Sequence, residues 1–174
     1  MFRLDDKIAL VTGASQGIGE AIARRLSAQG ARVVLAARNV SKLEALATAL
    51  GGGERACALP LDLARPEEIP ARLRELPSSF AAVDVLVNNA GITADNLLVR
   101  MSLDQWEQVL RTNLTGAFAL TREIVKGMMR RRYGRVIAVS SVVGLMGNAV
   151  QANYAAAKAG LIGFTKSVAR ELGS

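Results

Sequence analysis

The stretch KIALVTGASQGIGEAIARRL, residues 7–26, decides the fold of this chain. It begins with an aliphatic run, passes through a turn with three glycines and ends in a segment whose apolar residues recur at helical spacing. Glycines at positions 13, 17 and 19 let the backbone turn tightly, and the free amides of the following helix favour a phosphate group. A tight turn that holds no ligand is the alternative interpretation of the same glycines.

The rest of the sequence repeats this alternation. Apolar runs of strand length are expected at residues 31–38, 55–63, 83–91 and 134–141, and helices at 17–30, 41–50, 65–76, 102–132 and 151–173. We expect Ser41 to cap the second helix, with Glu44 completing a capping box. Continuous apolar strands between helices predict a parallel sheet covered on both faces. The fold class is therefore α/β, a doubly wound (Rossmann) sheet with five strands of the usual larger sheet.

The composition excludes several kinds of site. Of the 174 residues, 51% are hydrophobic and 21% are charged, which suits a single globular domain over residues 1–174. The chain has no histidine and only one cysteine, Cys57, so we expect no disulfide, no metal site and no Ser-His-Asp triad. The N-terminus lacks the apolar core of a signal peptide, and no window is long enough to span a membrane. We therefore expect a cytoplasmic protein.

The net charge of +7 suggests an acidic partner or simply a basic surface. Aromatic residues make up only 4% of the chain, and no basic strip carries stacking residues. Nucleic acid is therefore not an expected partner. The densest basic run, RRRYGR at residues 130–135, follows a predicted helix, where arginines also complement the helix dipole.

The end of the second predicted strand bears on the choice of cofactor. An acidic side chain at this place accepts hydrogen bonds from the ribose hydroxyls of NAD, and the segment VVLAARN contains none. It carries Arg38 instead, whose guanidinium suits a 2′-phosphate. The sequence thus favours NADP, although a solvated loop arginine would give the same pattern.

The segment QANYAAAKAG, residues 151–160, carries a phenol and an ammonium four residues apart on one predicted helix. Residues at this spacing share a helix face, so Lys158 is expected to stabilise the phenolate form of Tyr154. Tyr154 can then donate a proton to a developing alkoxide or accept one in the reverse direction. The pattern is weak alone and gains weight from Ser141 and from NNAG at residues 88–91, which end two other strands at the same sheet edge.

Together these motifs resemble the short-chain dehydrogenase/reductase family over essentially the whole chain from residue 7. The matching stretches are TGASQGIG at 12–19, NNAG at 88–91 and Y-x-x-x-K at 154–158. The resemblance implies that Asn113 holds a water in a proton relay, that Ser141 orients a substrate carbonyl and that Tyr154 is the acid/base. Asn113 as a surface helix residue and Ser141 as a simple cap are the alternatives. The implied cofactor residues are Gly13, Ser15, Gln16, Gly17, Ile18, Gly19, Arg38, Asp62, Leu63, Asn89, Ala90, Gly91, Tyr154 and Lys158.

Within that family, the stretches at 88–118 and 140–171 look most like enzymes that reduce 3-oxoacyl groups on acyl carrier protein during fatty acid synthesis. This similarity implies NADPH as the cofactor, a homotetramer, and an acidic carrier protein docking at Arg132. It also implies a further C-terminal segment, because only sixteen residues follow Lys158. We therefore expect the chain to be truncated after its catalytic helix. Another ketone or secondary alcohol as substrate, or an inactive dinucleotide-binding subunit, are the alternatives.

Overall fold

The computed structural model describes residues 3–173. Five strands occur among these residues: β1 (Ile8–Thr12), β2 (Arg32–Ala37), β3 (Ala56–Pro60), β4 (Val85–Asn88) and β5 (Arg135–Ala138). They form one parallel sheet in the order β3-β2-β1-β4-β5. The order reverses direction between β1 and β4, which is where ligands bind in open α/β sheets. The α/β fold class and its five strands are confirmed.

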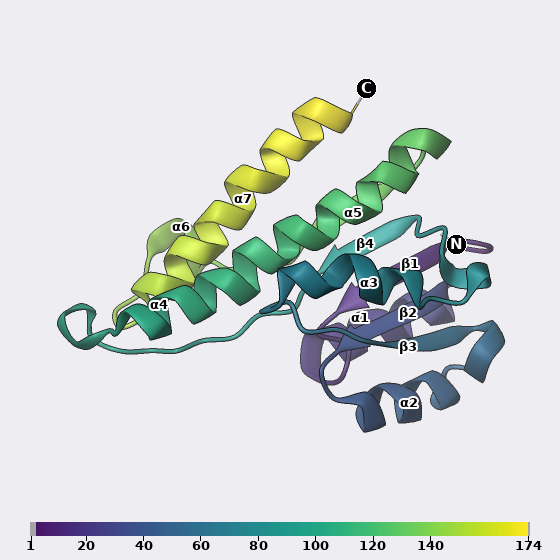
Figure 1. Ribbon diagram of the computed structural model, residues 1–174, viewed down its shortest axis with the longest axis horizontal. Coiled ribbons are helices and arrows are strands. Elements are labelled where there is room, and N and C mark those ends of the chain that lie inside the picture. The colour runs from purple at the N-terminus through teal and green to yellow at the C-terminus, as the bar shows by residue number, and fades with distance from the viewer. Residues whose placement is uncertain (1–2, 174) are drawn as a thin grey trace.

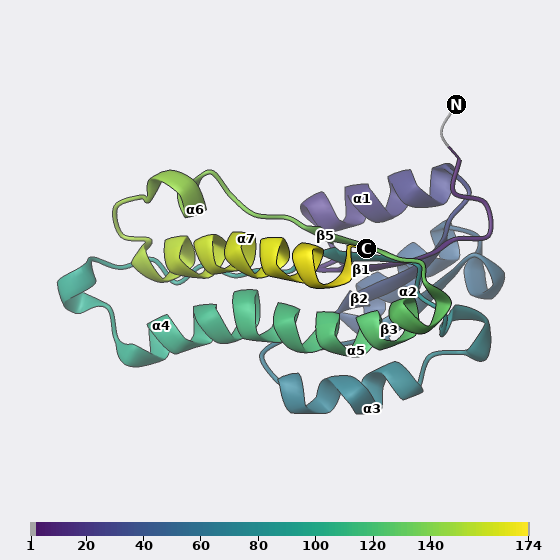
Figure 2. The ribbon, with the colours of Figure 1, turned by 90° about the horizontal axis from the view of Figure 1, so that it is seen from above.

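The helices are α1 (Gly17–Ala28), α2 (Val40–Ala49), α3 (Ile69–Arg74), α4 (Leu103–Leu110), α5 (Gly116–Arg131), α6 (Val143–Met146) and α7 (Ala152–Leu172). Helices α1 and α2 lie on one side of the sheet, and α5 and α7 lie on the other (Figure 1). Seen from above, α5 and α7 run side by side (Figure 2). No helix of the described residues has the length and apolarity needed to cross a membrane.

Alternation along the strands builds two separate cores. Leu10, Val34 and Leu86 point to the side of the sheet where Leu120 of α5 packs. Their neighbours Val11, Leu35 and Val87 point to the opposite side, against Ala23 of α1 and Leu43 of α2. Successive side chains of a strand face opposite ways, so a strand that is buried on both faces needs an unbroken apolar run. This arrangement explains the apolar composition of the first two strands.

Helix α2 begins differently from the sequence-based expectation. Asn39, in extended conformation, is the N-cap, and its Oδ1 accepts a hydrogen bond of 3.0 Å from the backbone amide of Lys42. The predicted cap Ser41 lies inside the first turn, so the proposed capping box with Glu44 is wrong. Asparagine and serine cap helices about equally well, which is why the sequence did not distinguish them.

The helix expected over residues 102–132 is interrupted. Ser102 caps α4 in a capping box with Gln105, as two hydrogen bonds of 3.0 and 3.1 Å show. A π-helical turn, Arg111–Thr115, then separates α4 from α5. Helix α4, α6 and the connection that follows β4 extend beyond the carboxyl edge of the sheet (Figures 1 and 2). This extension brings their side chains beside the ligand-binding edge.

Candidate active site

A cleft of about 490 Å³ lies at the carboxyl ends of β1, β2 and β4. Twelve of the fourteen residues predicted to bind the cofactor line it: Gly13, Ser15, Gln16, Gly17, Ile18, Gly19, Arg38, Asp62, Leu63, Asn89, Ala90 and Gly91. The other two, Tyr154 and Lys158, belong to α7 and are not among the lining residues. The fold therefore gathers these twelve residues from four separate stretches of sequence at one edge of the sheet.

The glycine-rich turn forms one wall of the cleft and serves two purposes. Gly19 packs against the backbone of Gly13, where a side chain would collide with the carbonyl oxygen. Gly17 has a φ of +58°, and a β-carbon built on it would meet nothing within 4 Å. No side chain of the described residues caps the N-terminus of α1. The first turn of α1 thus presents unpaired amides to the cleft, which is the property an anion site needs.

Thr12 joins the glycine-rich turn to the end of β4. Its Oγ1 donates to the carbonyl of Val87 at 3.1 Å and accepts from the amides of Asn89 and Ala90 at 2.9 and 3.0 Å. The side chain of Asn89 returns a hydrogen bond of 2.9 Å to the carbonyl of Thr12. Sequence reasoning missed Thr12 as a site-building residue, although threonine at the last position of a buried strand was a usable signal.

Asn113 lies in the π-helical turn, and its side chain contacts the connection that follows β4. Asn113 is 1% exposed, and its side chain makes two bonds to one residue. Its Oδ1 accepts from the amide of Ile92 at 2.8 Å, and its Nδ2 donates to the carbonyl of Ile92 at 2.9 Å. A β-carbon built on Gly91 would stand 3.4 Å from Oδ1 of Asn113, an ordinary van der Waals contact, so Gly91 lies beside this side chain. Asn113 is therefore buried and fixed, and the surface-helix interpretation is wrong.

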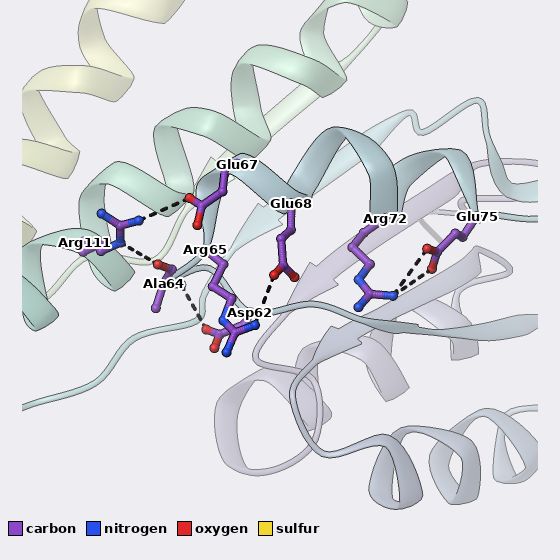
Figure 3. Close-up of polar contacts among 8 residues, drawn as sticks. All are labelled: Asp62, Ala64, Arg65, Glu67, Glu68, Arg72, Glu75 and Arg111. Atoms are coloured by element: carbon purple, nitrogen blue, oxygen red, sulfur yellow. Dashed lines mark hydrogen bonds and ion pairs between the residues drawn. The ribbon is translucent and has the colours of Figure 1, made fainter.

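Arg111, in the same π-helical turn, fastens the loop after β3 (Figure 3). Its Nε donates to the carbonyl of Ala64 at 2.6 Å, and its guanidinium pairs with Glu67 at 3.2 Å. The amide of Ala64 in turn donates to Asp62 at 3.0 Å. The pairs Arg65–Glu68 and Arg72–Glu75 in Figure 3 are exposed and therefore add little to stability. The contact with Ala64 matters more, because it orients a wall of the cleft.

Lys158 and Tyr154 lie on one side of α7, as the sequence predicts. Lys158 is 3% exposed, and its Nζ donates to the carbonyl of Val139 at 2.8 Å. The same atom lies 5.7 Å from the centre of the Tyr154 ring. Burial lowers the pKa of Lys158, because the ammonium loses its hydration. A β-carbon built on Gly91 would stand 3.6 Å from this nitrogen, which places the ammonium beside the cleft.

Asn153 fixes the first turn of α7 and was missed in the sequence. It is fully buried, and its Nδ2 donates to the carbonyls of Ala94 and Gln105 at 2.9 and 3.1 Å. Its Oδ1 accepts from the amide of Tyr154 at 2.8 Å. One side chain thereby joins α7, α4 and the loop after β4. An asparagine next to the tyrosine on an otherwise alanine-rich face was the available signal.

Ser141 and Arg132 lie in different parts of the molecule. Ser141 precedes α6, and its Oγ accepts from the amide of Val143 at 3.2 Å. The neighbouring Ser140 ties this loop to α7 by donating to the carbonyl of Lys158 at 3.0 Å. Arg132 ends α5 with a φ of +52° and lines a second groove of about 530 Å³. Because β5 starts only three residues later, Arg132 lies at the amino edge of the sheet, away from the cleft.

The phenol of Tyr154, beside the buried ammonium of Lys158, can exchange a proton with a substrate oxygen. The adjacent cleft, with the open N-terminus of α1, can hold an anionic ligand at the same time. Residues 7–174 match the model of the family described as short chain dehydrogenase. The chain is 53% identical over 171 residues to the 3-oxoacyl-[acyl-carrier-protein] reductase FabG of Vibrio cholerae serotype O1. It is 50% identical over 170 residues to the FabG of Escherichia coli (strain K12). Nodulation protein G of Rhizobium sp. (strain N33) is 54% identical over 172 residues.

These alignments cover 98–99% of this chain and 69% of each relative. The matched region contains the whole cleft, the π-helical turn and α7. The fold predicted from residues 7–26, the geometry around Tyr154 and the similarity to these relatives all indicate the same family. The chain therefore belongs to the short-chain dehydrogenase family of oxidoreductases.

Proposed function

We propose that this chain catalyses the NADPH-dependent reduction of a 3-oxoacyl thioester, carried on acyl carrier protein, to the 3-hydroxyacyl thioester. The observation that carries the proposal is the Tyr154–Lys158 pair, held beside the cleft by Val139 and Asn153. Two of the named relatives are 3-oxoacyl-[acyl-carrier-protein] reductases at half identity or better, which supports the choice of substrate.

The cleft suits a dinucleotide phosphate. The uncapped first turn of α1 offers amide donors for a pyrophosphate, and the open space over Gly17 leaves room for it. Asp62 and Leu63 form the wall assigned to the adenine, and Arg38 lies at the end of β2 where a 2′-phosphate would be read. When bound there, the reduced nicotinamide supplies a hydride to a carbonyl carbon.

The chain's own residues handle the proton. Tyr154 donates a proton to the oxygen of the substrate carbonyl, and the ammonium of Lys158 favours the phenolate that remains. We assign Ser141 to hold the carbonyl oxygen by a hydrogen bond, which would require its Oγ to turn its proton toward the substrate. Asn113 holds the connection at Ile92 in place, and we assign to it the water of a proton relay.

Other substrates are the second candidate. Nodulation protein G matches this chain as closely as the reductases do, and its name specifies no 3-oxoacyl group. The same four residues would reduce any ketone of suitable shape, so the chemistry stays the same and only the substrate differs. We retain the thioester because the two named reductases define a substrate and the nodulation protein does not.

We further propose that an acidic carrier protein docks at Arg132 and that the chain forms a homotetramer. Arg132 is exposed at the end of α5, and with the exposed Arg130 and Arg135 it gives this end of the helix a cationic surface. The guanidinium of Arg131 instead pairs with Asp84 at 3.7 Å. A carrier protein of negative charge would be attracted to this surface, more strongly at low salt. Replacing Arg132 by alanine should then weaken the binding of a carrier-bound substrate and leave the binding of a free thioester unchanged.

The decisive experiment measures NADPH oxidation with a short 3-oxoacyl thioester and with a free ketone of the same length. Tyr154→Phe is the matched variant, because it removes only the hydroxyl. We expect turnover with the thioester to exceed that with the ketone and to be lost in the variant. Equal rates in the variant would refute the role of Tyr154. Faster reduction of the free ketone would favour the second candidate.

A further inference from the structure

Lys42 makes a contact that the proposed function does not use. It lies in the first turn of α2, and its Nζ donates a hydrogen bond of 3.2 Å to Oε1 of Gln16, 26 residues earlier in the chain. Gln16 lines the cleft and immediately precedes α1. The ammonium of Lys42 therefore reaches from one helix to the glycine-rich turn in front of the next.

The contact has little value for stability. Both side chains are exposed, and an exposed polar contact between two long side chains barely offsets the entropy of ordering them. What it does establish is a position for a positive charge. The ammonium has three donor hydrogens, of which Gln16 takes one. The other two remain for a ligand.

Lys42 itself is not a lining residue of the cleft, but two further features bring its charge near the end that Arg38 lines. Arg38 and Asn39, the two residues that precede α2, both line the cleft. Asn39 caps α2 through the amide of Lys42 itself, so the lysine is anchored at its backbone as well as at its tip. Among the cleft-lining residues that the structure describes, Asp62 is the one carboxylate, and it accepts a hydrogen bond from Ala64.

We propose that Lys42, held by Gln16, is a second specificity-determining residue for the 2′-phosphate of NADPH, alongside Arg38. This inference rests on the proposed use of NADPH. A phosphate that carries close to two negative charges gains from two flanking cations, whereas the 2′-hydroxyl of NADH gains almost nothing from either. The lysine should therefore act on the choice between the two cofactors and leave the common part of the binding energy unchanged.

The test measures dissociation constants of NADPH and NADH by nucleotide fluorescence, with no need for turnover. In Lys42→Met we expect NADPH binding to weaken about tenfold, a typical loss for one charge-assisted contact, and NADH binding to stay within about twofold. Lys42→Arg should recover most of the NADPH affinity. Lys166→Met removes one charge from the exposed side of α7 and should change neither constant, which controls for net charge.

A second pair of ligands isolates the phosphate. Adenosine 2′,5′-bisphosphate and adenosine 5′-monophosphate differ only in that group. Lys42→Met should therefore weaken the binding of the bisphosphate and leave the binding of the monophosphate unchanged. Gln16→Ala, which frees the lysine without removing its charge, should weaken the bisphosphate by a smaller factor.

The outcomes separate the two proposals. A wild-type chain that binds NADH as tightly as NADPH would overturn the proposed cofactor. A wild-type preference for NADPH that Lys42→Met leaves unchanged would overturn the role of Lys42 alone. Equal weakening of both cofactors would also overturn it, because the lysine would then act on the shape of the turn.

Discussion

Alanine substitutions at Gly17 and Gly19 should separate the packing of the glycine-rich turn from its binding function. At Gly19 the added methyl group would collide with the carbonyl oxygen of Gly13 and stand 2.6 Å from Nδ2 of Asn89. At Gly17 it would meet nothing within 4 Å, and the cost would come from the φ of +58°. One substitution thus overpacks the interior, and the other strains the backbone and projects into the cleft.

The magnitudes follow from these two costs. Overpacking against backbone costs about 3 kcal/mol, and alanine recovers about 1 kcal/mol as a better helix former, so Gly19→Ala should lose about 2 kcal/mol. A left-handed alanine costs about 1–2 kcal/mol, partly offset by the lower entropy of the unfolded chain, so Gly17→Ala should lose about 1 kcal/mol. The corresponding drops in melting temperature are about 4–8 °C and about 2–4 °C.

Circular dichroism during heating and NADPH fluorescence provide the two readouts. Gly17→Ala should weaken NADPH at least tenfold, by about 1.4 kcal/mol or more, because the methyl group occupies the approach to the α1 amides. Its effect on binding should thus exceed its effect on stability. Normal NADPH affinity in Gly17→Ala would mean that the turn does not hold the phosphates. An unchanged melting temperature in Gly19→Ala would refute the packing described for α1.

Four further outcomes are expected. Burial raises the pKa of the Cys57 thiol from 9.0 to about 11, so at pH 8 iodoacetamide should alkylate the folded chain about a hundredfold more slowly than the urea-unfolded chain; similar rates would contradict this. Burial lowers the pKa of Lys158 in the folded chain, so as pH rises toward 10.5 the unfolded chain binds more protons than the folded chain. The free energy of unfolding should therefore rise between pH 8 and pH 10 relative to that of Lys158→Met, which urea midpoints at the two pH values can show. Asn153→Ala leaves buried carbonyls unpaired and should cost about 3 kcal/mol, while slowing turnover more than it weakens NADPH. Arg111→Met should weaken NADPH binding severalfold, as measured by calorimetry, with a loss in the free energy of unfolding below about 1 kcal/mol. An unaltered dissociation constant would show that Arg111 does not affect the cleft.

The sequence predicts the layers of this fold well because the apolar runs of β1, β2 and β4 are buried as their composition indicates. The run at residues 8–12 is buried at every position, and a strand with no polar face belongs inside a parallel sheet. The cleft is predictable for the same reason, since parallel strands place their carboxyl ends at one edge. Gly13, Arg38 and Asn89 come from three different strand ends and line one cleft.

Features that depend on long-range contacts were less accessible. Asn39 and Ser41 are equally plausible caps, and which of them begins the helix depends on where β2 ends. Asn153 gives no periodic signal, because its value comes from carbonyl groups 48 and 59 residues away. The roles proposed for Ser141 and Arg132 stay predictions, since the first requires a bound substrate and the second a partner.

The π-helical turn unites what the sequence left separate. Three consecutive residues, Arg111, Thr112 and Asn113, contact the loop after β3, line the cleft and clamp the connection after β4, respectively. Directly after the turn, Gly116 packs so closely on the carbonyl of Leu63 that no side chain would fit there. A π-turn lacks the regular ladder of an α-helix, so it persists only where outside contacts compensate for that loss. Here the contacts that compensate are the walls of the cleft itself, so a ligand that orders those walls would also stabilise the turn that holds Asn113.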